Sequence, residues 1–516
     1  MNAPRFYLTT AIDYPNSRPH IGTAFEKLGA DVQARYRRMQ GYDVVFLMGT
    51  DENTVKVSKR AAELGMEVQA YCDDMARQFR EVWDALGISY DIFIQTSHAR
   101  HRDCCRKFIQ KVYDNGHIYK GPYEGWYCDG CEEFKTDKQH AENDGKCPNH
   151  KTPLTRRSEQ CYFFRLSAFA DRLLDHYRRH PEFVQPDSRR NELISLIENE
   201  GLKDINISRY NQSWGIRIPF DEDYTIYVWF DALLTYVTGI GYGDDRATYD
   251  HLWPADIQFI GKDITRFHCA LWPAMLWAAG EESPRQVFGH GFVYFDGEKM
   301  AKTLGNIVEP MDVITKFSAQ AFRYYFMREC PFPSDGDFSW KRFFEVYNAD
   351  LANNLGNLFS RMTRLAAKNH GGVLPGTAGL KPNGIVANVA EIVARVQGHV
   401  EACRYHQALQ TIWLEVLNPA NKYVEEMKPW SLFKTDPAAS ARVLYELADV
   451  LRLVSIVLKP FMPEASNTIY TAFNFAPAWD AVRYEDAMQW PERQDDLRLG
   501  EALATEGVKP LFPRID

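Results

Sequence analysis

The chain has 516 residues, of which 45% are hydrophobic, 25% charged and 14% aromatic. This composition is typical of a packed globular protein of several domains, and it excludes a mainly disordered, collagen-like or coiled-coil chain. The formal net charge is −9, so any contact with nucleic acid must come from a local basic patch.

The sequence also bears on the compartment. No stretch approaches the roughly 20 apolar residues that cross a bilayer, and the first residues lead into a strand-like segment without a secretory leader. The ten cysteines are too few for a disulfide scaffold in a chain of this length. We therefore expect a cytoplasmic protein that does not contact a membrane.

Residues 1–50 have the pattern of a strand, a crossover helix and a second strand. Residues 5–11 alternate as a strand does, and apolar residues at helical spacing from Ile21 to Tyr36 predict a helix that ends at Gln40-Gly41. Residues 44–48 are apolar at every position, as in a parallel strand that is covered on both faces. This is half of a doubly wound sheet.

A similar unit recurs downstream, with strands predicted at 257–260 and 286–288 and a helix between them that ends near residue 279. Two separated half-sheets imply an insertion, which we place at 116–211. That segment contains glycines, prolines and a cysteine cluster, and we expect no long periodic elements in it. After about residue 338 the apolar spacing is helical, as in residues 443–458, and predicts a helical bundle.

The expected fold is therefore α/β, a Rossmann-like doubly wound parallel sheet that is split by an insertion with a cysteine cluster and followed by an all-α bundle. We expect five segments: the first half of the Rossmann-like domain (1–115), the connective insertion (116–211), the second half of the Rossmann-like domain (212–290), a lysine loop with a linker (291–338) and the α-helical domain (339–516).

The insertion contains the pattern of a structural zinc site. Cys128 and Cys131 are separated by two residues, fifteen residues follow, and Cys147 and His150 are again separated by two. Three thiolates and one imidazole at this spacing are typical of tetrahedral zinc. Four protein ligands fill the coordination sphere, so the zinc would stabilise the insertion and would not activate water.

Two further motifs suit a phosphate ligand. Pro19-His20-Ile21-Gly22 lies where the first strand's loop enters the first helix, and free N–H groups at a helix N-terminus favour an anion. His20 could donate a hydrogen bond to phosphate, although a histidine that only caps the helix is an open alternative. Residues 297–306 hold Lys299 and Lys302 between glycines, which suits a loop that closes on a triphosphate, or merely an exposed lysine pair.

Taken together, these two motifs resemble the HIGH and KMSKS signatures of the class I aminoacyl-tRNA synthetases. Longer segments are similar to the methionyl-tRNA synthetase family in particular, namely 14–16, 49–52, 227–233, 259–264 and 272–275. The resemblance covers almost the whole chain, and it implies the subtype with a single zinc knuckle.

The resemblance implies the roles of the site residues. Asp51 would bind the α-ammonium group of methionine, and the other methionine-binding residues would be Ile12, Tyr14, Trp229, Ala232, Leu233, Tyr236, Ile264 and His268. The catalytic residues would be His20, Lys299 and Lys302. The ATP site would comprise His20, Gly22, Thr23, Gly261, Asp263, His290, Gly291 and Lys302, with Mg²⁺ accompanying ATP. A box of apolar and aromatic groups with one soft polar contact suits a thioether.

In the bundle, Asn357 and Arg361 lie four residues apart on one helical face, and Lys428-Pro429-Trp430 ends another helix. An amide, a guanidinium and an indole suit unstacked RNA bases, through edge hydrogen bonds and stacking. By the resemblance, Asn357, Arg361, Pro429 and Trp430 would read the anticodon of methionine tRNA.

The sequence departs from the family pattern at the reaction centre. Thr23 replaces the second histidine of the first signature, Ala301 and Thr303 replace two serines of the lysine loop, and Asn53-Thr54 replace a His-Gly pair. Threonine is shorter than histidine but still donates a hydrogen bond, and loss of one such donor costs about 10²-fold in rate.

Two functions follow from this pattern. The first is an active enzyme that forms methionyl-adenylate from methionine and ATP and transfers methionine to tRNA. The second is a paralogue that binds tRNA but has lost or narrowed its catalysis. The presence of His20, Asp51 and Lys302 favours the enzyme.

Relatives specific for other amino acids fit less well. The isoleucyl, valyl and leucyl enzymes carry a large editing domain, whereas this insertion has only about 100 residues. The cysteinyl enzymes use zinc at the amino-acid site, whereas this cysteine cluster lies in the insertion. The sequence shows no obvious dimerisation module, so we expect a monomer.

Overall fold

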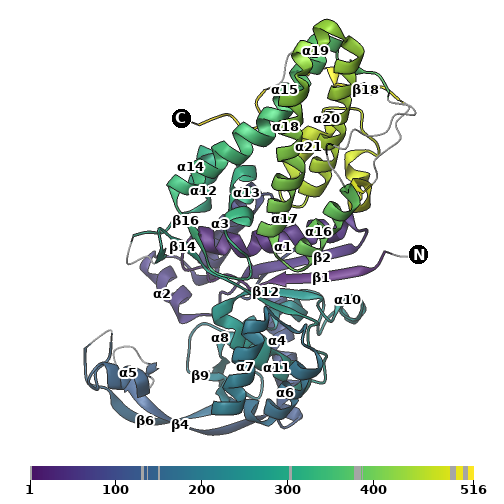
Figure 1. The fold of residues 1–516 in the computed structure, drawn as a ribbon. Coiled ribbons are helices and arrows are strands. Elements are labelled where there is room, and N and C mark those ends of the chain that lie inside the picture. The colour runs from purple at the N-terminus through teal and green to yellow at the C-terminus, as the bar shows by residue number, and fades with distance from the viewer. Residues whose placement is uncertain are drawn as a thin grey trace.

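The computed structural model describes residues 3–128, 133–135, 137–148, 151–300, 305–376, 385, 388–488, 495–501, 503 and 509–515. A six-stranded parallel sheet lies at the centre of the molecule (Figure 1). Its strands, in spatial order, are β3 (Ile92–Gln95), β2 (Asp43–Thr50), β1 (Arg5–Thr10), β12 (Ile257–Gly261), β13 (Val287–His290) and β7 (Val184–Gln185).

The pairing of β1 with β12 joins the two half-sheets, with Leu8 opposite Ile257 and Thr10 opposite Phe259. This confirms the doubly wound α/β arrangement. Neither edge strand, β3 nor β7, was predicted. β7 lies within the range assigned to the insertion, yet it pairs with β13. Two residues are too few for a recognisable pattern, so its place is set by the neighbouring strand.

Strand alternation divides the sheet into two faces. Phe6, Phe46 and Phe259 pack into one hydrophobic core with α1 (Ile21–Met39), α3 (Val68–Ala85) and the C-terminal bundle. Tyr7, Leu47 and Ile260 pack into a second core on the opposite face. The elements there are α4 (Ala99–Asp114), α6 (Ala170–Arg179), α7 (Asp187–Glu200), α8 (Val228–Ala232), α9 (Thr235–Thr238), α10 (Arg246–Leu252) and α11 (Trp272–Ala278).

The inserted segment contains longer elements than the sequence analysis expected. Ten residue pairs join β4 (Ile118–Cys128) to β6 (Thr155–Phe164) in an antiparallel ribbon that extends away from the body (Figure 1). The expectation was wrong because Gly121, Pro122 and Gly125 interrupt the alternation of β4, whereas the partner strand determines the pairing. The ribbon's sheet is completed by β5 (Glu133–Lys135) and β8 (Ile205–Asn206), and α5 (Asp137–Glu142) lies near its tip.

Two small sheets connect these parts. The first contains β9 (Ser208–Tyr210), β10 (Arg217–Ile218) and β11 (Asp221–Ile226). The second contains β14 (Val293–Phe295), β15 (Glu298–Lys299) and β16 (Gly336–Phe338), and it leads into the bundle. Three further helices are α2 (Val55–Glu63), α12 (Pro310–Lys316) and α13 (Ala319–Glu329).

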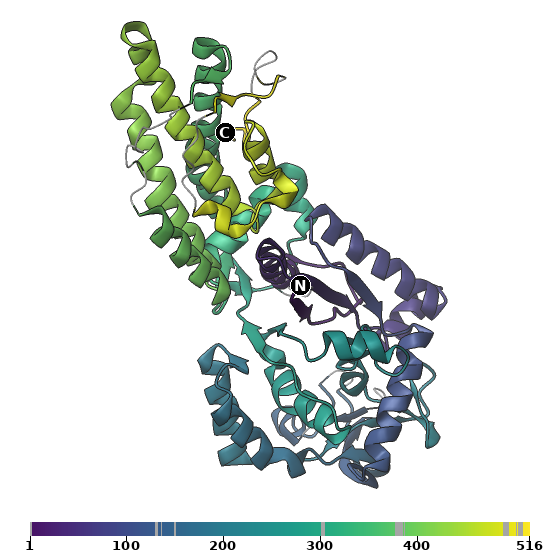
Figure 2. The ribbon, with the colours of Figure 1, turned by 90° about the vertical axis from the view of Figure 1, so that its right-hand side faces the viewer.

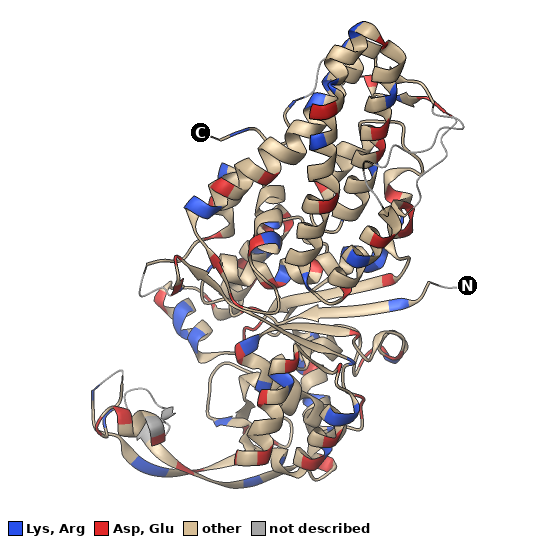
Figure 3. Cartoon of the chain, viewed as in Figure 1, with Lys and Arg blue, Asp and Glu red and all other residues tan. Residues whose placement is uncertain are grey.

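The C-terminal region is a helical bundle that stands on one side of the sheet (Figure 2). Its helices are α14 (Trp340–Val346), α15 (Asn357–His370), α16 (Val389–Glu401), α17 (Tyr405–Ile412), α18 (Asn418–Met427), α19 (Pro429–Thr435), α20 (Pro437–Leu458) and α21 (Pro463–Thr471), and β17 (Val373–Leu374) pairs with β18 (Leu497–Arg498). Lys and Arg are interspersed with Asp and Glu along these helices (Figure 3). Within the described residues, none of the helices is both long and apolar enough to cross a membrane.

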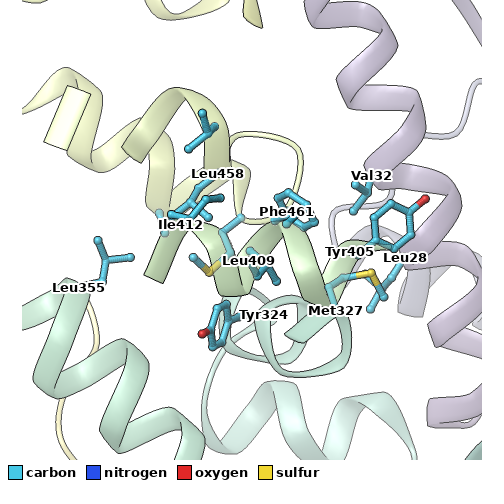
Figure 4. Close-up of a cluster of buried hydrophobic side chains, with 14 of the residues drawn as sticks. Leu28, Val32, Tyr324, Met327, Leu355, Tyr405, Leu409, Ile412, Leu458 and Phe461 are labelled. Atoms are coloured by element: carbon cyan, nitrogen blue, oxygen red, sulfur yellow. The ribbon is translucent and has the colours of Figure 1, made fainter. Parts of the chain in front are cut away.

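The bundle packs directly on α1. Figure 4 shows Leu28 and Val32 of α1 beside Tyr405 of the bundle, and the Tyr405 hydroxyl donates a hydrogen bond to the Gly29 carbonyl over 2.8 Å. A Cβ atom at Gly29 would lie 2.2 Å from the Phe332 ring, so the glycine lets this ring pack closely against the backbone of α1. The helix that begins at the predicted phosphate motif therefore also forms part of the interface with the bundle.

Candidate active site

The nine residues predicted to bind methionine line one small cavity, together with Ala11. They come from the loop after β1, the end of β2, helices α8 and α9, and the turn after β12. These loops meet because the carboxyl ends of parallel strands lie at one edge of a sheet, where open α/β folds bind ligands. The lining residues are Ala11, Ile12, Tyr14, Asp51, Trp229, Ala232, Leu233, Tyr236, Ile264 and His268.

His268 supplies a neutral polar contact in this cavity. Its Nδ1 lies 3.1 Å from the Ile264 carbonyl, and its Nε2 lies 2.8 Å from the Tyr236 hydroxyl. A carbonyl only accepts, so Nδ1 carries the proton and Nε2 accepts from tyrosine. Burial lowers the pKa of His268 to about 4. The residue belongs to a π-helical turn, Phe267–Leu271, and such turns are frequent at functional sites.

Asp51 places a buried carboxyl group at the other side of the cavity. Burial, followed by repulsion from Asp231 and Glu52, raises the pKa of Asp51 well above its ordinary value, and a hydrogen bond from Tyr14 opposes this rise. The Asp51 Oδ1 atom is buried and has no hydrogen-bond partner within the described part of the chain. Burial therefore disfavours the charged form of this carboxyl group, and a cationic ligand at Oδ1 would stabilise that form.

Asp231 and Asn53 belong to the same buried polar cluster as Asp51, and neither was predicted to line the pocket. Asn53 Nδ2 donates to Asp231 Oδ2 over 3.0 Å. Burial raises the pKa of Asp231 well above its ordinary value, although the Asn53 hydrogen bond and the charge of Arg102 oppose this. Asp231 lies in the quoted segment 227–233, so its position was available from the sequence, but its proximity to Asp51 requires the fold.

The helix N-terminus at His20 is arranged differently from the expectation. His20 Nδ1 accepts hydrogen bonds from the backbone N–H groups of Gly22 (3.1 Å) and Thr23 (3.3 Å). The N–H of Ile21 donates to Val308 O and that of Ala24 to His20 O, each over 3.0 Å. The expectation of free N–H groups was therefore wrong, because the side chain and neighbouring carbonyls satisfy them.

His20 still has one ring nitrogen for a ligand. Burial lowers the pKa of His20, and because Nδ1 accepts two hydrogen bonds, the proton of the neutral ring lies on Nε2. A Cβ atom at Gly22 would lie 3.0 Å from His20 Cε1 and 3.4 Å from Met300 Cε. Glycine thus leaves room for the His20 cap. The short distance to Met300 also shows that the start of the lysine loop lies beside the first motif.

The lysine loop is described only in part. Lys299 ends β15 and is exposed, with its Nζ 4.8 Å from the Phe292 ring. Lys302, together with Ala301 and Thr303, lies outside the described residues. The role of Lys302 therefore stays a prediction from the sequence.

On the predicted nucleotide side, Asp263 is exposed just after β12, where its Oδ1 lies 2.7 Å from the position of a Cβ atom on Gly261. His290 is instead buried, with Nδ1 2.7 Å from the Gly291 carbonyl and Nε2 3.0 Å from Glu26 Oε2. Both ring nitrogens thus have protein partners. At Gly291, a Cβ atom would lie 2.1 Å from the Ser334 backbone, so this glycine permits a close approach of two backbone segments.

The predicted zinc ligands can be compared with the structure at two positions. Cys128 and Cys147 are fully buried in one small cluster with Leu154, and the Cys147 N–H donates to the Thr152 carbonyl in a tight turn (2.8 Å). Cys131 and His150 lie outside the described residues, and the described ones contain no group of three or more metal-ligating side chains. Two thiols from separate loops in one cluster nevertheless fit a thiolate site for zinc.

At the far end of the bundle, Arg361 and Trp430 lie together, with the Arg361 guanidinium 4.4 Å from the Trp430 ring. Arg361 also forms an ion pair with Glu425. Asn357 is exposed one turn earlier on α15. The segment expected to end a helix does so at Lys428, but Pro429 and Trp430 begin the next helix, α19, because proline suits a first helical position.

Comparisons with known proteins cover the whole chain. A family model described as "tRNA synthetases class I (M)" matches residues 6–161 and 149–363. A second model, described as "Anticodon binding domain of methionyl tRNA ligase", matches residues 374–508. The two models together account for the sheet, the insertion and the bundle.

Among curated relatives, the methionine–tRNA ligase of Thermosynechococcus vestitus is 43% identical, over 98% of this chain and 95% of its own length. That of Caldanaerobacter subterraneus subsp. tengcongensis is 41% identical, over 99% of this chain and 79% of its own. The structure of Mycobacterium tuberculosis methionyl-tRNA synthetase in complex with methionyl-adenylate has a TM-score of 0.89 and 38% identity, and the match covers 99% of this chain and 100% of that one. The free form of that synthetase has a TM-score of 0.84 and 36% identity.

Proposed function

Because the chain belongs to the methionine–tRNA ligases, a family of class I tRNA synthetases, we propose how its own residues carry out that activity. The reaction activates L-methionine with ATP to methionyl-adenylate and pyrophosphate, and then transfers the methionyl group to methionine tRNA. The observation that carries the residue assignment is the cavity, since all nine predicted methionine-binding residues line it. The alternative of a paralogue without catalysis has no comparable support.

Methionine binds with its ammonium group at Asp51 and its thioether against the aromatic wall. The unpartnered Oδ1 of Asp51 supports the first contact, because a cation bound there compensates the charge that Asp231 and Glu52 concentrate. Neutral His268 and the Trp229 ring, which stacks on Phe267 at 4.0 Å, provide a polarizable surface for sulfur. This orientation directs the carboxylate of methionine away from the wall toward the nucleotide side.

The methionine carboxylate then attacks the α-phosphorus of ATP in line, and pyrophosphate leaves. His20 donates from Nε2 to phosphate oxygens, Lys302 and Lys299 stabilise the charge that builds on the leaving group, and Asp263 with Gly261 contacts the ribose. Mg²⁺ would bind with ATP and neutralise part of the triphosphate charge. No covalent intermediate with the enzyme is required, so catalysis consists of positioning and electrostatic stabilisation.

Thr23 and Asn53 depart from the family pattern, but both have contacts that suit the proposed site. Thr23 N–H donates to the His20 ring, and its hydroxyl remains a donor for phosphate in place of the second histidine of the family signature. Asn53 supports the pocket by donating to Asp231. His290 acts through its contacts with Glu26 and the Gly291 carbonyl, so it stabilises the nucleotide side without contacting adenine through a ring nitrogen.

The bundle would recognise the anticodon, with Trp430 and Arg361 stacking on bases and Asn357 and Pro429 beside them. Their proximity at the end of the bundle supports this assignment. One zinc ion would be held by Cys128, Cys131, Cys147 and His150 as a structural brace for the insertion. We further propose that the enzyme is a cytoplasmic monomer.

The test is methionine-dependent exchange of pyrophosphate into ATP by the purified, zinc-replete protein, with isoleucine, valine, leucine and cysteine as controls. Exchange with methionine alone is the expected result. Lys302→Ala should abolish this exchange while leaving methionine binding nearly intact. Absence of exchange with every amino acid, in a protein that still binds methionine tRNA, would instead support the paralogue without catalysis.

A further inference from the structure

A chain of buried charges runs beneath the cavity. Lys27 of α1 has no exposed side-chain surface, and its Nζ lies 2.7 Å from Glu26 Oε1 and 3.1 Å from Asp13 Oδ1. The same ammonium donates to the Ala11 carbonyl over 2.6 Å. Glu26 continues the chain, since its other oxygen lies 3.0 Å from His290 Nε2.

This chain joins the two substrate sides. At one end, Asp13 and Ala11 belong to the loop after β1 that lines the methionine cavity. The backbone N–H of Asp51 donates to the Asp13 carbonyl over 2.8 Å, and the N–H of Asp13 donates to Gly49 O over 2.9 Å. At the other end, His290 ends β13, on the predicted nucleotide side. Lys27 therefore contacts the loop that carries Ile12 and Tyr14. It also contacts the Glu26 carboxylate, which in turn contacts His290.

Packing alone does not explain an ammonium group at this position. Burial of a lysine and two carboxylates costs several kcal/mol for each ion, and apolar residues of similar size often replace such groups without loss of stability. The Lys27 ammonium donates to the Ala11 carbonyl and to Glu26 Oε1, and it forms an ion pair with Asp13. This geometry fixes a position more precisely than an apolar contact would, because hydrogen bonds are directional.

These charges also influence the titratable groups of the cavity. Burial would lower the pKa of Lys27, but Asp13 and Glu26 outweigh burial and raise it, so the ammonium stays charged. Burial raises the pKa of Asp13 to about 7, although Lys27 opposes this rise. Burial would raise the pKa of Glu26, but Lys27 and His290 together lower it. The negative charge of Glu26 in turn acts on His268 and Tyr236 of the cavity.

We propose that Lys27 is a positioning residue for methionine activation, which holds the cavity loop of Ala11–Tyr14 in register with the Glu26–His290 pair on the nucleotide side. This inference rests on the proposed function. Lys27 touches neither substrate and acts through the Ala11 carbonyl, Asp13 and Glu26. Its effect is therefore a coupling between the two substrate sites, beyond its contribution to stability.

The experiment measures methionine-dependent exchange, with KM for methionine and for ATP determined separately, in Lys27→Met, Asp13→Asn and the double variant. Lys27→Met should raise KM for methionine about tenfold and KM for ATP about threefold, with kcat changed less than about threefold. Asp13→Asn should raise KM for methionine about threefold. The double variant should be no worse than Lys27→Met, because both substitutions remove the same contact.

The matched control is Arg35→Met on the same helix. Arg35 pairs with Asp31 at 2.7 Å and lies outside the predicted substrate sites, so its loss should lower Tm while both KM values stay within about twofold. Asp13→Asn, which preserves shape, tests the contact even if Lys27→Met does not fold.

Two results would overturn the positioning role: a lowered Tm with unchanged KM values in Lys27→Met, or effects that multiply in the double variant. No exchange by the wild-type protein would overturn the proposed function itself. A normal wild-type rate with an unchanged methionine KM in Lys27→Met would overturn only the positioning role.

Discussion

Asp31 and Asp51 are both buried carboxylates, but the two regions around them treat the charge in opposite ways. At the junction between α1 and the bundle, Asp31 Oδ2 lies 2.7 Å from Arg35 and 2.6 Å from Arg323. Burial would raise the pKa of Asp31, but the two arginines and a hydrogen bond from Ser89 outweigh it and lower the pKa. In the cavity, burial and then repulsion from Asp231 and Glu52 raise the pKa of Asp51 well above its ordinary value.

We propose that this difference distinguishes a charge that stabilises the fold from a carboxyl group that binds a ligand. Arg323, which is fully buried, also donates to the carbonyls of Leu86, Pro460 and Phe461, so the junction contains its own counter-charge. Asp51 Oδ1, in contrast, has no hydrogen-bond partner within the described residues. We infer that the substrate's ammonium group pairs with this atom.

The largest expected effect breaks the junction. Arg323→Met leaves Asp31 buried with one arginine fewer and removes the donors to the bundle, and it should cost about 3–5 kcal/mol of unfolding free energy. Denaturant unfolding of the purified protein measures this. Asp31→Asn in the same background should restore part of the loss, since it removes the uncompensated charge. An unchanged unfolding midpoint in Arg323→Met would contradict the account of the junction.

The next largest effect is expected from a substitution in the cavity that impairs methionine binding and leaves the fold intact. Asp51→Asn should lower kcat/KM for methionine in the exchange reaction by about 10²-fold or more, because the amide cannot neutralise the ammonium. Its Tm without ligand should equal or exceed that of the wild type, because a repelled buried charge is removed. A protein with lowered Tm and nearly normal kcat/KM would show that Asp51 serves the fold, as Asp31 does.

A smaller effect is expected at the far end of the bundle. Trp430→Ala should lower charging of methionine tRNA about tenfold, since stacking of one base contributes about 1–3 kcal/mol, while exchange stays unchanged. Trp479→Ala is the matched control: a lysine also lies over this indole, at 4.2 Å, but outside the predicted anticodon site. Equal losses of exchange and charging in Trp430→Ala would indicate a defect of folding.

The smallest effect is on the pH dependence of stability without ligand. Asp31 has a lowered pKa, so its contribution is present above the ordinary carboxyl pKa of about 4 and is lost as pH falls through the folded value. Asp51 has a raised pKa, so its contribution is present below about pH 4 and is lost as pH rises through the folded value. The measured loss of unfolding free energy with falling pH that Asp31 causes should be absent in Asp31→Asn. The loss with rising pH that Asp51 causes should be absent in Asp51→Asn. Identical profiles in both variants would contradict the comparison.

Much of the site could be predicted from the sequence because its residues lie in long motifs. Trp229, Tyr236 and His268 belong to or lie beside segments whose spacing is specific, and the structure brings them to one cavity. The parallel sheet was predictable for a similar reason, since a strand apolar at every residue is buried on both faces. Both depend on local pattern.

The remainder depends on contacts between distant residues. The cap formed by His20 Nδ1, the ion pairs of Lys27 and the edge position of β7 have no local signature. The β4–β6 ribbon was missed because glycine and proline obscured its alternation, whereas strand pairing with a distant partner overrides such local signals.

The most direct test of the central claim is the equilibrium binding of L-methionine and of 4-(methylthio)butanoate, which lacks only the amino group, to the wild-type protein and to Asp51→Asn. If Asp51 binds the ammonium group of the substrate, the wild type binds methionine at least about 10²-fold more tightly than the analogue. The Asp51→Asn protein loses most of this preference. Equal affinity of the wild type for the two ligands would contradict the claim that the unpaired carboxylate is completed by the substrate.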